Sequence, residues 1–231
     1  MNNIGSWWMR IGLMGCAGMV LLAGCSDPKK ASDGNFKKAI DAYLVKKPMC
    51  INAPTSDTRP AGQERGASPF PAYVAMPTAP AGQSNFEDRT RSFDALVKSG
   101  LASTSTGTIE SDSSWGGSKT KLAVKIYNLT EQGQKAFVKS PDGNPYGNDF
   151  CYGTPAVSEV TQFTEPSAAF GATMSSVAYT YHVNDQAGWA TNPAMVEAFP
   201  ILKQATGDKL EGKTTVVLTN NGWVDSRGSK F

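Results

Sequence analysis

The residues of this chain with the most distinctive chemistry are four cysteines and one histidine. Cys16 and Cys25 lie near the N-terminus, whereas Cys50 and Cys151 are about 100 residues apart. Thiols can be modified covalently, oxidised to disulfides or used as metal ligands, and a zinc site usually needs several Cys and His residues close together. His182 is the single histidine and has no cysteine near it in the sequence. The spacing therefore predicts no metal site and leaves covalent modification and disulfide formation as the chemistry of the thiols.

The residues before Cys25 indicate an export signal. Arg10 is followed by 12 residues, from Ile11 to Leu22, that are all apolar or glycine. Small residues then lead into the cysteine, and this order is typical of secretory signal peptides. A transmembrane helix needs about 20 apolar residues to cross the hydrocarbon core. The shorter run, interrupted by glycines, therefore favours a signal peptide over a membrane span.

The four residues Leu22-Ala23-Gly24-Cys25 resemble the lipobox of bacterial lipoproteins. In that family the cysteine thiol receives a diacylglyceryl group, a peptidase cuts before the cysteine, and the new amino group is often acylated, for example with palmitate. The resemblance implies that residues 1–24 are a signal peptide and that Cys25 is lipidated, which gives stable anchoring. Ser26 rather than aspartate follows the cysteine, which favours the outer membrane, facing the periplasm. An ordinary signal peptide with an incidental cysteine is the alternative.

The mature chain would contain 207 residues, with 21 basic and 20 acidic side chains, since the signal peptide holds Arg10 and no acid. Cys50 and Cys151 then remain as an even pair in an exported protein, which predicts one disulfide between them. The alternative is two separate buried thiols. A net charge of +1 gives no case for binding nucleic acid, which calls for a basic patch or stripe.

The first half of the mature chain alternates helical and β patterns around a proline-rich stretch. Residues 25–34 are polar and predict a flexible tether, and apolar positions at helical spacing predict a helix over 35–46. Residues 52–85 contain six prolines, so we expect no regular structure there beyond one short strand. A helix over 92–100 is predicted next, then two strands joined by a Gly-rich loop and a short helix capped by Thr130.

This order of elements resembles the end of a winged-helix domain. In that fold a helix leads into a two-stranded wing, and the pattern Tyr-x-Leu-Thr-x-x-Gly follows the second strand. The matching residues here are Tyr127, Leu129, Thr130 and Gly133, and the resemblance covers roughly residues 86–138. The predicted helix before the proline-rich stretch would belong to the same bundle. The proline-rich insertion and the scarcity of basic residues near the recognition helix depart from the family pattern.

The second half of the chain is dominated by β patterns. Alternation predicts a strand over 172–183, and a helix is predicted over 189–204, which Pro200 would kink or split. The predicted fold class is therefore α+β. It comprises a winged-helix-like part over 35–140, which includes the proline-rich insertion, and a β-rich part over 141–231, which forms a small antiparallel sheet with a covering helix.

Two side chains are candidates for a functional role. His182 lies in the middle of a predicted strand without a nucleophile signature such as Gly-x-Ser-x-Gly, so we interpret it as a solvent-facing or packed residue. Trp115 lies in the polar, Gly-rich tip of the predicted hairpin. Tryptophan is enriched at binding hot spots, which makes Trp115 a candidate for contact with a partner. The alternative is that its ring folds back onto the body of the protein.

These observations lead to three hypotheses of function. The first is a lipid-anchored envelope lipoprotein with a non-enzymatic binding or structural role in the periplasm, towards a protein partner. No catalytic residues, cofactor site or metal site are predicted for it. The second is an enzyme acting on envelope polymers, with a site that only the fold would assemble. The third is DNA binding, against which both export and the near-neutral charge argue.

Overall fold

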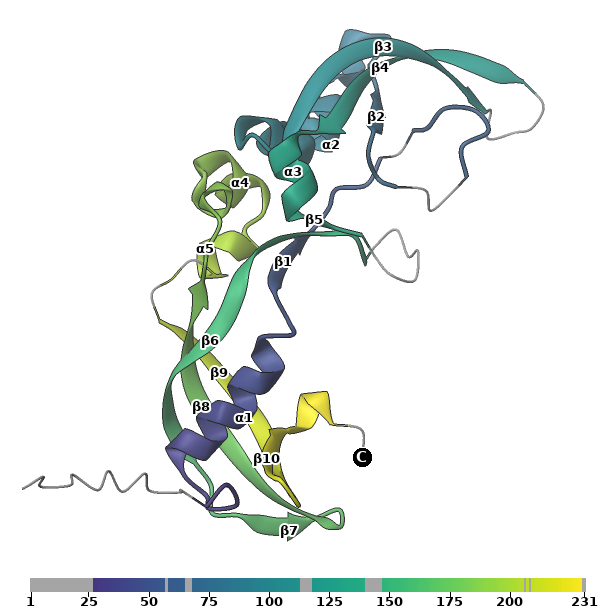
Figure 1. The fold of residues 1–231 in the computed structure, drawn as a ribbon. Helices are drawn as coiled ribbons and strands as arrows, with labels where there is room; N and C mark the ends of the chain where they lie inside the picture. The colour runs from purple at the N-terminus through teal and green to yellow at the C-terminus, as the bar shows by residue number, and fades with distance from the viewer. Residues whose placement is uncertain are drawn as a thin grey trace, which may run out of the picture.

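The computed structural model describes residues 27–56, 58–64, 68–112, 118–139, 147–205, 207 and 209–229. The molecule is elongated and curved, with two regions joined by the long strand β6 (Asp149–Phe163) (Figure 1). We call the region around the helix α1 (Asp33–Leu44) the base. We call the opposite region, around the helix α2 (Gln83–Lys98), the head.

The base contains α1, the second half of β6 and the strands β7 to β10. The head contains α2 to α5 and the strands β2 to β4, and β1 and β5 pair with the start of β6 between the two regions. The remaining elements are β1 (Met49–Asn52), β2 (Ala72–Ala75), η1 (Pro80–Gly82), β3 (Ala102–Asp112), β4 (Lys119–Leu129), α3 (Glu131–Ala136), β5 (Phe137–Val138), β7 (Ser167–Ala169), β8 (Ala172–Asn184), η3 (Gly188–Thr191), α4 (Pro193–Ala198), α5 (Ile201–Ala205), β9 (Leu210–Thr219), β10 (Gly222–Asp225) and η4 (Ser226–Gly228).

A seven-stranded antiparallel sheet forms the frame of the base. Its main order is β1-β6-β8-β9-β10, with β5 added beside β6 and β7 beside β8. The helix α1 packs against β6 and β10. Ser32 caps the helix by accepting the backbone N–H of Asn35. Phe36, Ile40 and Leu44 recur at helical spacing and are buried, so one stripe of the helix covers one face of the sheet.

A bulge in β6 is held by side chains of α1. Pairing with β8 shifts register between Val157 and Glu159, which leaves backbone groups of the bulged strand outside the ladder. Asp41 Oδ1 accepts the backbone N–H of Val157 at 2.8 Å, and the Lys37 ammonium donates to the Val157 carbonyl. Lys37 and Asp41 also pair with each other at 2.9 Å. The helix therefore fixes the position of the bulge as well as covering the sheet.

The head is built on a three-stranded sheet of order β2-β4-β3, against which α2 packs. The Phe93 ring stacks on the Tyr127 ring with centroids 4.8 Å apart, and both side chains are buried. Phe70, Phe137 and Phe150 extend this aromatic cluster towards β6. The aromatic core thus continues from the head into the start of the large sheet.

The expectation of a winged-helix part followed by a small sheet is wrong. The first helix, α1, packs on β6 and β10 in the base and does not join α2 in a bundle. The predicted hairpin exists as β3 and β4, but β2 from the proline-rich stretch adds a third strand to it. The sheet expected to be small instead has seven strands, because β1 and β5 pair with β6. The protein is thus dominated by antiparallel β-structure.

The motif behind that expectation has a local explanation. Thr130 caps α3 by accepting the backbone N–H of Gly133 at 3.0 Å, and Tyr127 is a fully buried core residue of β4. The pattern therefore describes a strand that turns into a capped helix, a junction that many folds can use. The predicted short strand in the proline-rich stretch is confirmed as β2, but the expectation of no other regular structure there is wrong, because η1 and the start of α2 also lie in that stretch. The helix around Pro200 is split into α4 and α5.

Candidate functional site

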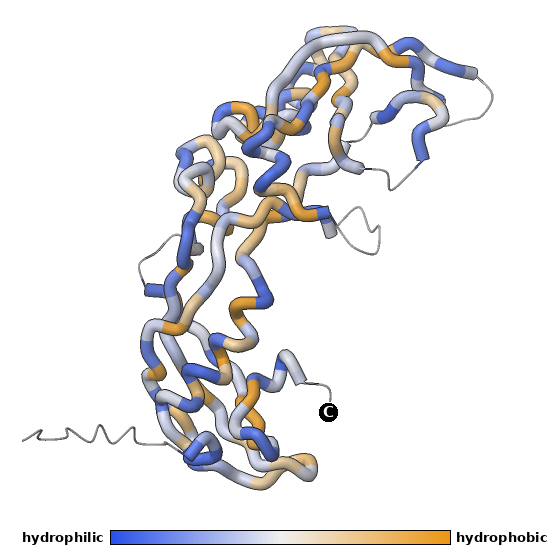
Figure 2. Tube along the Cα trace, viewed as in Figure 1, coloured by the Kyte–Doolittle hydropathy of each residue, from blue (hydrophilic) through white to orange (hydrophobic). Residues whose placement is uncertain are grey.

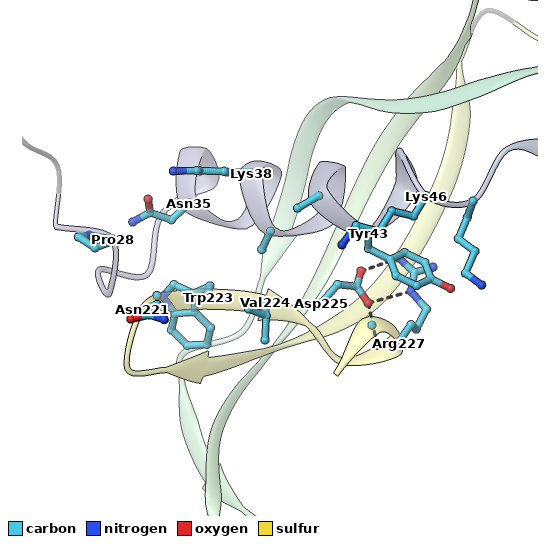
Figure 3. A pocket seen from close by; sticks show the side chains of 15 residues that line it. Pro28, Asn35, Lys38, Tyr43, Lys46, Asn221, Trp223, Val224, Asp225 and Arg227 are labelled. Atoms are coloured by element: carbon cyan, nitrogen blue, oxygen red, sulfur yellow. Dashed lines mark hydrogen bonds and ion pairs between the residues drawn. The ribbon is translucent and has the colours of Figure 1, made fainter. Parts of the chain in front are cut away.

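A groove with a volume of about 430 Å³ runs along the base between α1 and β10. One wall is formed by α1, which contributes Asn35, Lys38 and Tyr43, and the other wall by β10 and η4, which contribute Trp223 and Arg227 (Figure 3). The groove exists because the narrow apolar stripe of α1 is turned to the sheet. The polar residues on the flank of the helix are left facing the C-terminal hairpin.

Three lysines give the groove its charge. Lys38, Lys46 and Lys47 line it and are exposed. Among the described residues, no carboxylate forms an ion pair with any of the three. Lys46 and Lys47 follow the last residue of α1, where the helix dipole places partial negative charge and favours cations. That position helps to stabilise the helix end and leaves both ammonium groups available to another molecule.

Asp225, the one carboxylate among the described residues that line the groove, is neutralised within the fold. It is 3 % exposed, and Arg227 reaches it twice, from Nε to Oδ1 at 2.9 Å and from Nη2 to Oδ2 at 2.6 Å. The Thr214 hydroxyl donates to Oδ1 at 3.1 Å. The hydrogen bonds that the Arg227 side chain donates to Asp225 raise the pKa of Arg227 above its ordinary value.

The Arg227 guanidinium completes this wall of the groove. Its carbon lies 4.5 Å from the centre of the Tyr43 ring, a cation–π distance, and Nη2 donates to the Tyr179 hydroxyl at 3.3 Å. Figure 3 shows Tyr43 and Arg227 facing each other across the end of the groove. Because Arg227 and Asp225 cancel each other in charge, the lysines set the net charge of the groove, which is positive.

The N-terminal end of the groove is closed by residues just after Cys25. Asn35 Nδ2 donates to the carbonyls of Asp27 and Lys30, at 2.9 and 2.8 Å, and Trp223 Nε1 donates to the Lys29 carbonyl at 3.0 Å. Pro28 also lines this end, against the turn between β9 and β10. The described part of the predicted tether is thus docked on the base. The docked segment includes Asp27, two residues after Cys25 in the sequence.

The structure brings His182 together with two residues that the sequence analysis did not connect to it. Its Nδ1 lies 2.8 Å from Ser158 Oγ, and its Nε2 lies 2.9 Å from Asn184 Oδ1. Ser158 occupies the bulge of β6, and His182 and Asn184 share one face of β8. With Nε2 protonated towards Asn184, Nδ1 can accept the serine proton. The contact between Ser158 and His182 depends on the bulge in β6. No local pattern in the sequence reveals that bulge.

The remaining predicted site residues have different outcomes. The Cys50–Cys151 disulfide is confirmed, and the two residues face each other in the register of β1 and β6. Cys25 and Trp115 lie outside the described residues, so lipidation and partner contact stay predictions. In the described ranges, no group of three or more His, Cys, Asp or Glu side chains is arranged to hold a metal ion. None of the described helices has the length and apolar character needed to span a bilayer.

Comparison with known proteins adds no family assignment. No protein-family model matches this chain, and it has no significant match to a curated protein or to a solved structure. Sequence reasoning missed the groove because Lys38 and Arg227 are far apart in the chain and each resembles an ordinary surface residue.

Proposed function

We propose that this protein is a lipid-anchored envelope lipoprotein with a non-enzymatic binding role, and that its groove takes an acidic segment of a protein partner in the periplasm. The lipobox at Leu22 to Cys25 supports the anchor, and Ser26 favours the outer membrane. The groove supports the binding role. The groove lies between a helix and a hairpin and is lined by residues from both, so a segment of a partner would contact both walls.

The observation that carries the proposal is the imbalance of charge in the groove. Lys38, Lys46 and Lys47 have no partner among the described carboxylates, whereas Asp225 is compensated by Arg227. A carboxylate entering the groove therefore meets three ammonium groups and no exposed negative charge. Because these lysines lie at the rim, they should raise the rate of association and make binding sensitive to salt.

The test is photo-cross-linking in intact cells. A photoreactive phenylalanine analogue is placed at Ala42, an exposed residue of the groove wall, and at Thr106, an exposed residue of β3 in the head. We expect a discrete adduct from position 42 that disappears when Lys38, Lys46 and Lys47 are changed to Glu.

The control is a charge reversal of equal size outside the groove. Lys98, Lys121 and Lys203 are exposed and do not line the groove, so changing them to Glu should leave the adduct in place. Equal loss in both triple variants would mean that overall charge, not the groove, governs the contact. An adduct from position 106 and none from position 42 would contradict the proposal directly.

A hydrolase is the second candidate, and the Ser158–His182–Asn184 geometry favours it. In this scheme His182 takes the proton from Ser158, whose oxygen attacks the substrate, while Asn184 orients the imidazole. The serine and asparagine side chains are exposed on the sheet, and neither they nor His182 lines the groove, so the binding role is the stronger proposal.

A fluorophosphonate probe separates the two functions. The Ser158 oxygen would bond to phosphorus, fluoride would leave, and the proton would pass to His182. Labelling of the wild type that is lost in Ser158→Ala and in His182→Ala would support the hydrolase. If the probe labels no serine of the protein, the hydrolase is ruled out and only the binding role stays as a proposal.

A further inference from the structure

Phe170 is the clearest unpartnered apolar side chain of the described chain, with 100 % of its surface exposed. It occupies the tip of the hairpin between β7 and β8, where Phe170 and Gly171 have φ angles of 51° and 80°. A two-residue turn with positive φ at both positions normally takes Asn-Gly or Asp-Gly. A bulky aromatic residue at positive φ is uncommon. The turn itself therefore gives no reason for a phenylalanine here.

The residues of the hairpin around Phe170 are uncharged. Residues 166–174 contain serine, alanine, glycine, threonine, proline and methionine beside the phenylalanine, and no charged side chain. Figure 2 shows the β7–β8 hairpin in white and pale orange at the lower end of the molecule. A small apolar tip with one protruding ring is thus presented to the surroundings at this end.

The register of the sheet places this tip beside the N-terminal segment. Met174 pairs with Val217, and beyond this pair β8 continues to the turn at Phe170 and β9 to the turn at Asn221. Pro28 lies against Gly222, directly after the second turn. The hairpin tip, the β9–β10 turn and the start of the docked chain therefore share one end of the base (Figure 1).

The position of the predicted anchor puts this end close to lipid. Asp27 is docked through its carbonyl to Asn35, and one residue separates it from Cys25. Two residues of extended chain span at most about 7 Å. Lys29 and Lys30 are exposed at the same end, with Asp27 Oδ1 accepting the backbone N–H of Lys29. A lipid group on Cys25 would hold this end of the molecule at the bilayer surface.

We infer that the β7–β8 tip is a membrane contact, with the Phe170 ring inserted at the boundary between headgroups and acyl chains and with Lys29 and Lys30 facing lipid phosphates. Phenylalanine is among the apolar residues that peripheral proteins bury at that boundary, and basic residues are attracted to anionic headgroups. This inference rests on the proposed lipid anchor at Cys25. It sets an orientation, in which the base stands on the membrane and the head projects away from it.

The test uses the lipidated protein in vesicles of phosphatidylethanolamine and phosphatidylglycerol. Phe170→Cys is labelled with the environment-sensitive dye NBD, and Thr106→Cys on β3 is the matched control in the head. We expect NBD at position 170 to shift its emission to the blue and to be quenched by lipids that carry a nitroxide on the upper acyl chain. The dye at position 106 should show neither effect.

The possible results distinguish failure of the membrane contact from failure of the lipid anchor on which it rests. If the mass of the protein shows the lipid and the protein floats with the vesicles, but the dye at position 170 stays in water, the membrane contact is wrong and the anchor stands. A blue shift without nitroxide quenching would place the dye in an apolar protein environment outside the acyl chains, and would also overturn the inference. A protein that carries no lipid and does not float would overturn both.

Discussion

The base and the head differ in how their polar groups are used. In the head, Asp94 Oδ1 accepts from Lys125 at 2.6 Å and from the buried Tyr127 hydroxyl at 2.7 Å, so three polar groups satisfy one another beside an aromatic core. In the base, Lys38, Lys46 and Lys47 line a groove without a described carboxylate partner.

Apolar groups show the same contrast. The rings of Phe70, Phe93 and Phe150 are buried in the core that extends from the head, whereas Phe170 at the end of the base is fully exposed. Single exposed side chains are normal on a protein surface, so the informative features of the base are the gathering of three lysines without a described carboxylate partner in one groove and the complete exposure of Phe170. We therefore propose that recognition and membrane contact belong to the base, where these lysines gather in one groove and one ring is fully exposed at a hairpin tip. Each prediction below tests that division.

The largest effect is expected from the disulfide, which lies where β1 leads from the base towards the head. Changing both Cys50 and Cys151 to Ser removes a cross-link between residues 101 positions apart. The chain-entropy model gives a loss of about 4.7 kcal/mol in the free energy of unfolding for a loop of about 100 residues. Urea denaturation without reductant measures the loss, and reduction of the wild type should reproduce it. Equal stability of wild type and variant would show that other contacts join the two regions.

The next test compares the two cores by one substitution in each. Phe36 in the base and Phe93 in the head are both buried, so each change to Ala should cost about 3–5 kcal/mol. Hydrogen exchange locates the damage. We expect Phe36→Ala to raise exchange in α1 and β10, and Phe93→Ala to raise it in α2 and β4. A uniform rise throughout the molecule in both variants would mean that base and head unfold as one unit.

A smaller effect is expected at the arginine of the groove. Arg227→Ala leaves the buried Asp225 carboxylate without its charged partner, so we expect a loss of about 1.5–3 kcal/mol, the range for hydrogen bonds to charged groups. Arg91→Ala in the head is the matched control, because Arg91 and its partner Asp88 are both mostly exposed. Exposed pairs contribute about 0–1 kcal/mol. Similar melting temperatures for the two variants would contradict the structural role assigned to Arg227.

Alkaline pH should lower the free energy of unfolding of the head, because Tyr127 is buried there. Burial, with a further contribution from the hydrogen bond to Asp94, raises the pKa of Tyr127 above its ordinary value of 10.0. Above about pH 10 the unfolded chain loses this proton while the folded chain keeps it. The stability due to this group is therefore complete below pH 10 and falls by at most about 1.4 kcal/mol per pH unit above it.

The control for the alkaline effect is Tyr127→Phe. This variant should lose stability less steeply than the wild type in denaturation experiments above pH 10. Burial also raises the pKa values of Tyr152 and Tyr181, so part of the decline should remain. Identical slopes for wild type and variant would show that Tyr127 does not ionise on unfolding in that range.

Local features of this molecule could be predicted from its sequence, and long-range ones could not. The first helix, the strand over 172–183, the split at Pro200 and the disulfide all depend on spacing, propensity or residue type within short windows or on cysteine number. The partner of α1 depends instead on which strands align with β6, and this pairing is decided by contacts across most of the chain. The winged-helix expectation extended the local motif from Tyr127 to Gly133 into a bundle that included the first helix, but that helix packs in the base.

The candidate site was hidden for the same reason. The groove joins α1 to the C-terminal hairpin, and the contact between Ser158 and His182 depends on a bulge that shifts the pairing of β6 with β8. One signal was available in the N-terminal segment. Ser32 is a favoured helix cap, and a capped helix starting so close to Cys25 leaves little chain for a flexible tether.

The assignment of function to the base depends most directly on the chemistry of Cys25. The decisive measurement is mass spectrometry of the mature protein purified from the membrane fraction, with fragmentation of its N-terminal peptide. We expect a mature chain that begins at Cys25 and carries a diacylglyceryl group on its sulfur, and a Cys25→Ala variant that leaves the membrane fraction. A mature chain that begins at another residue, or a Cys25 without lipid, would contradict this expectation.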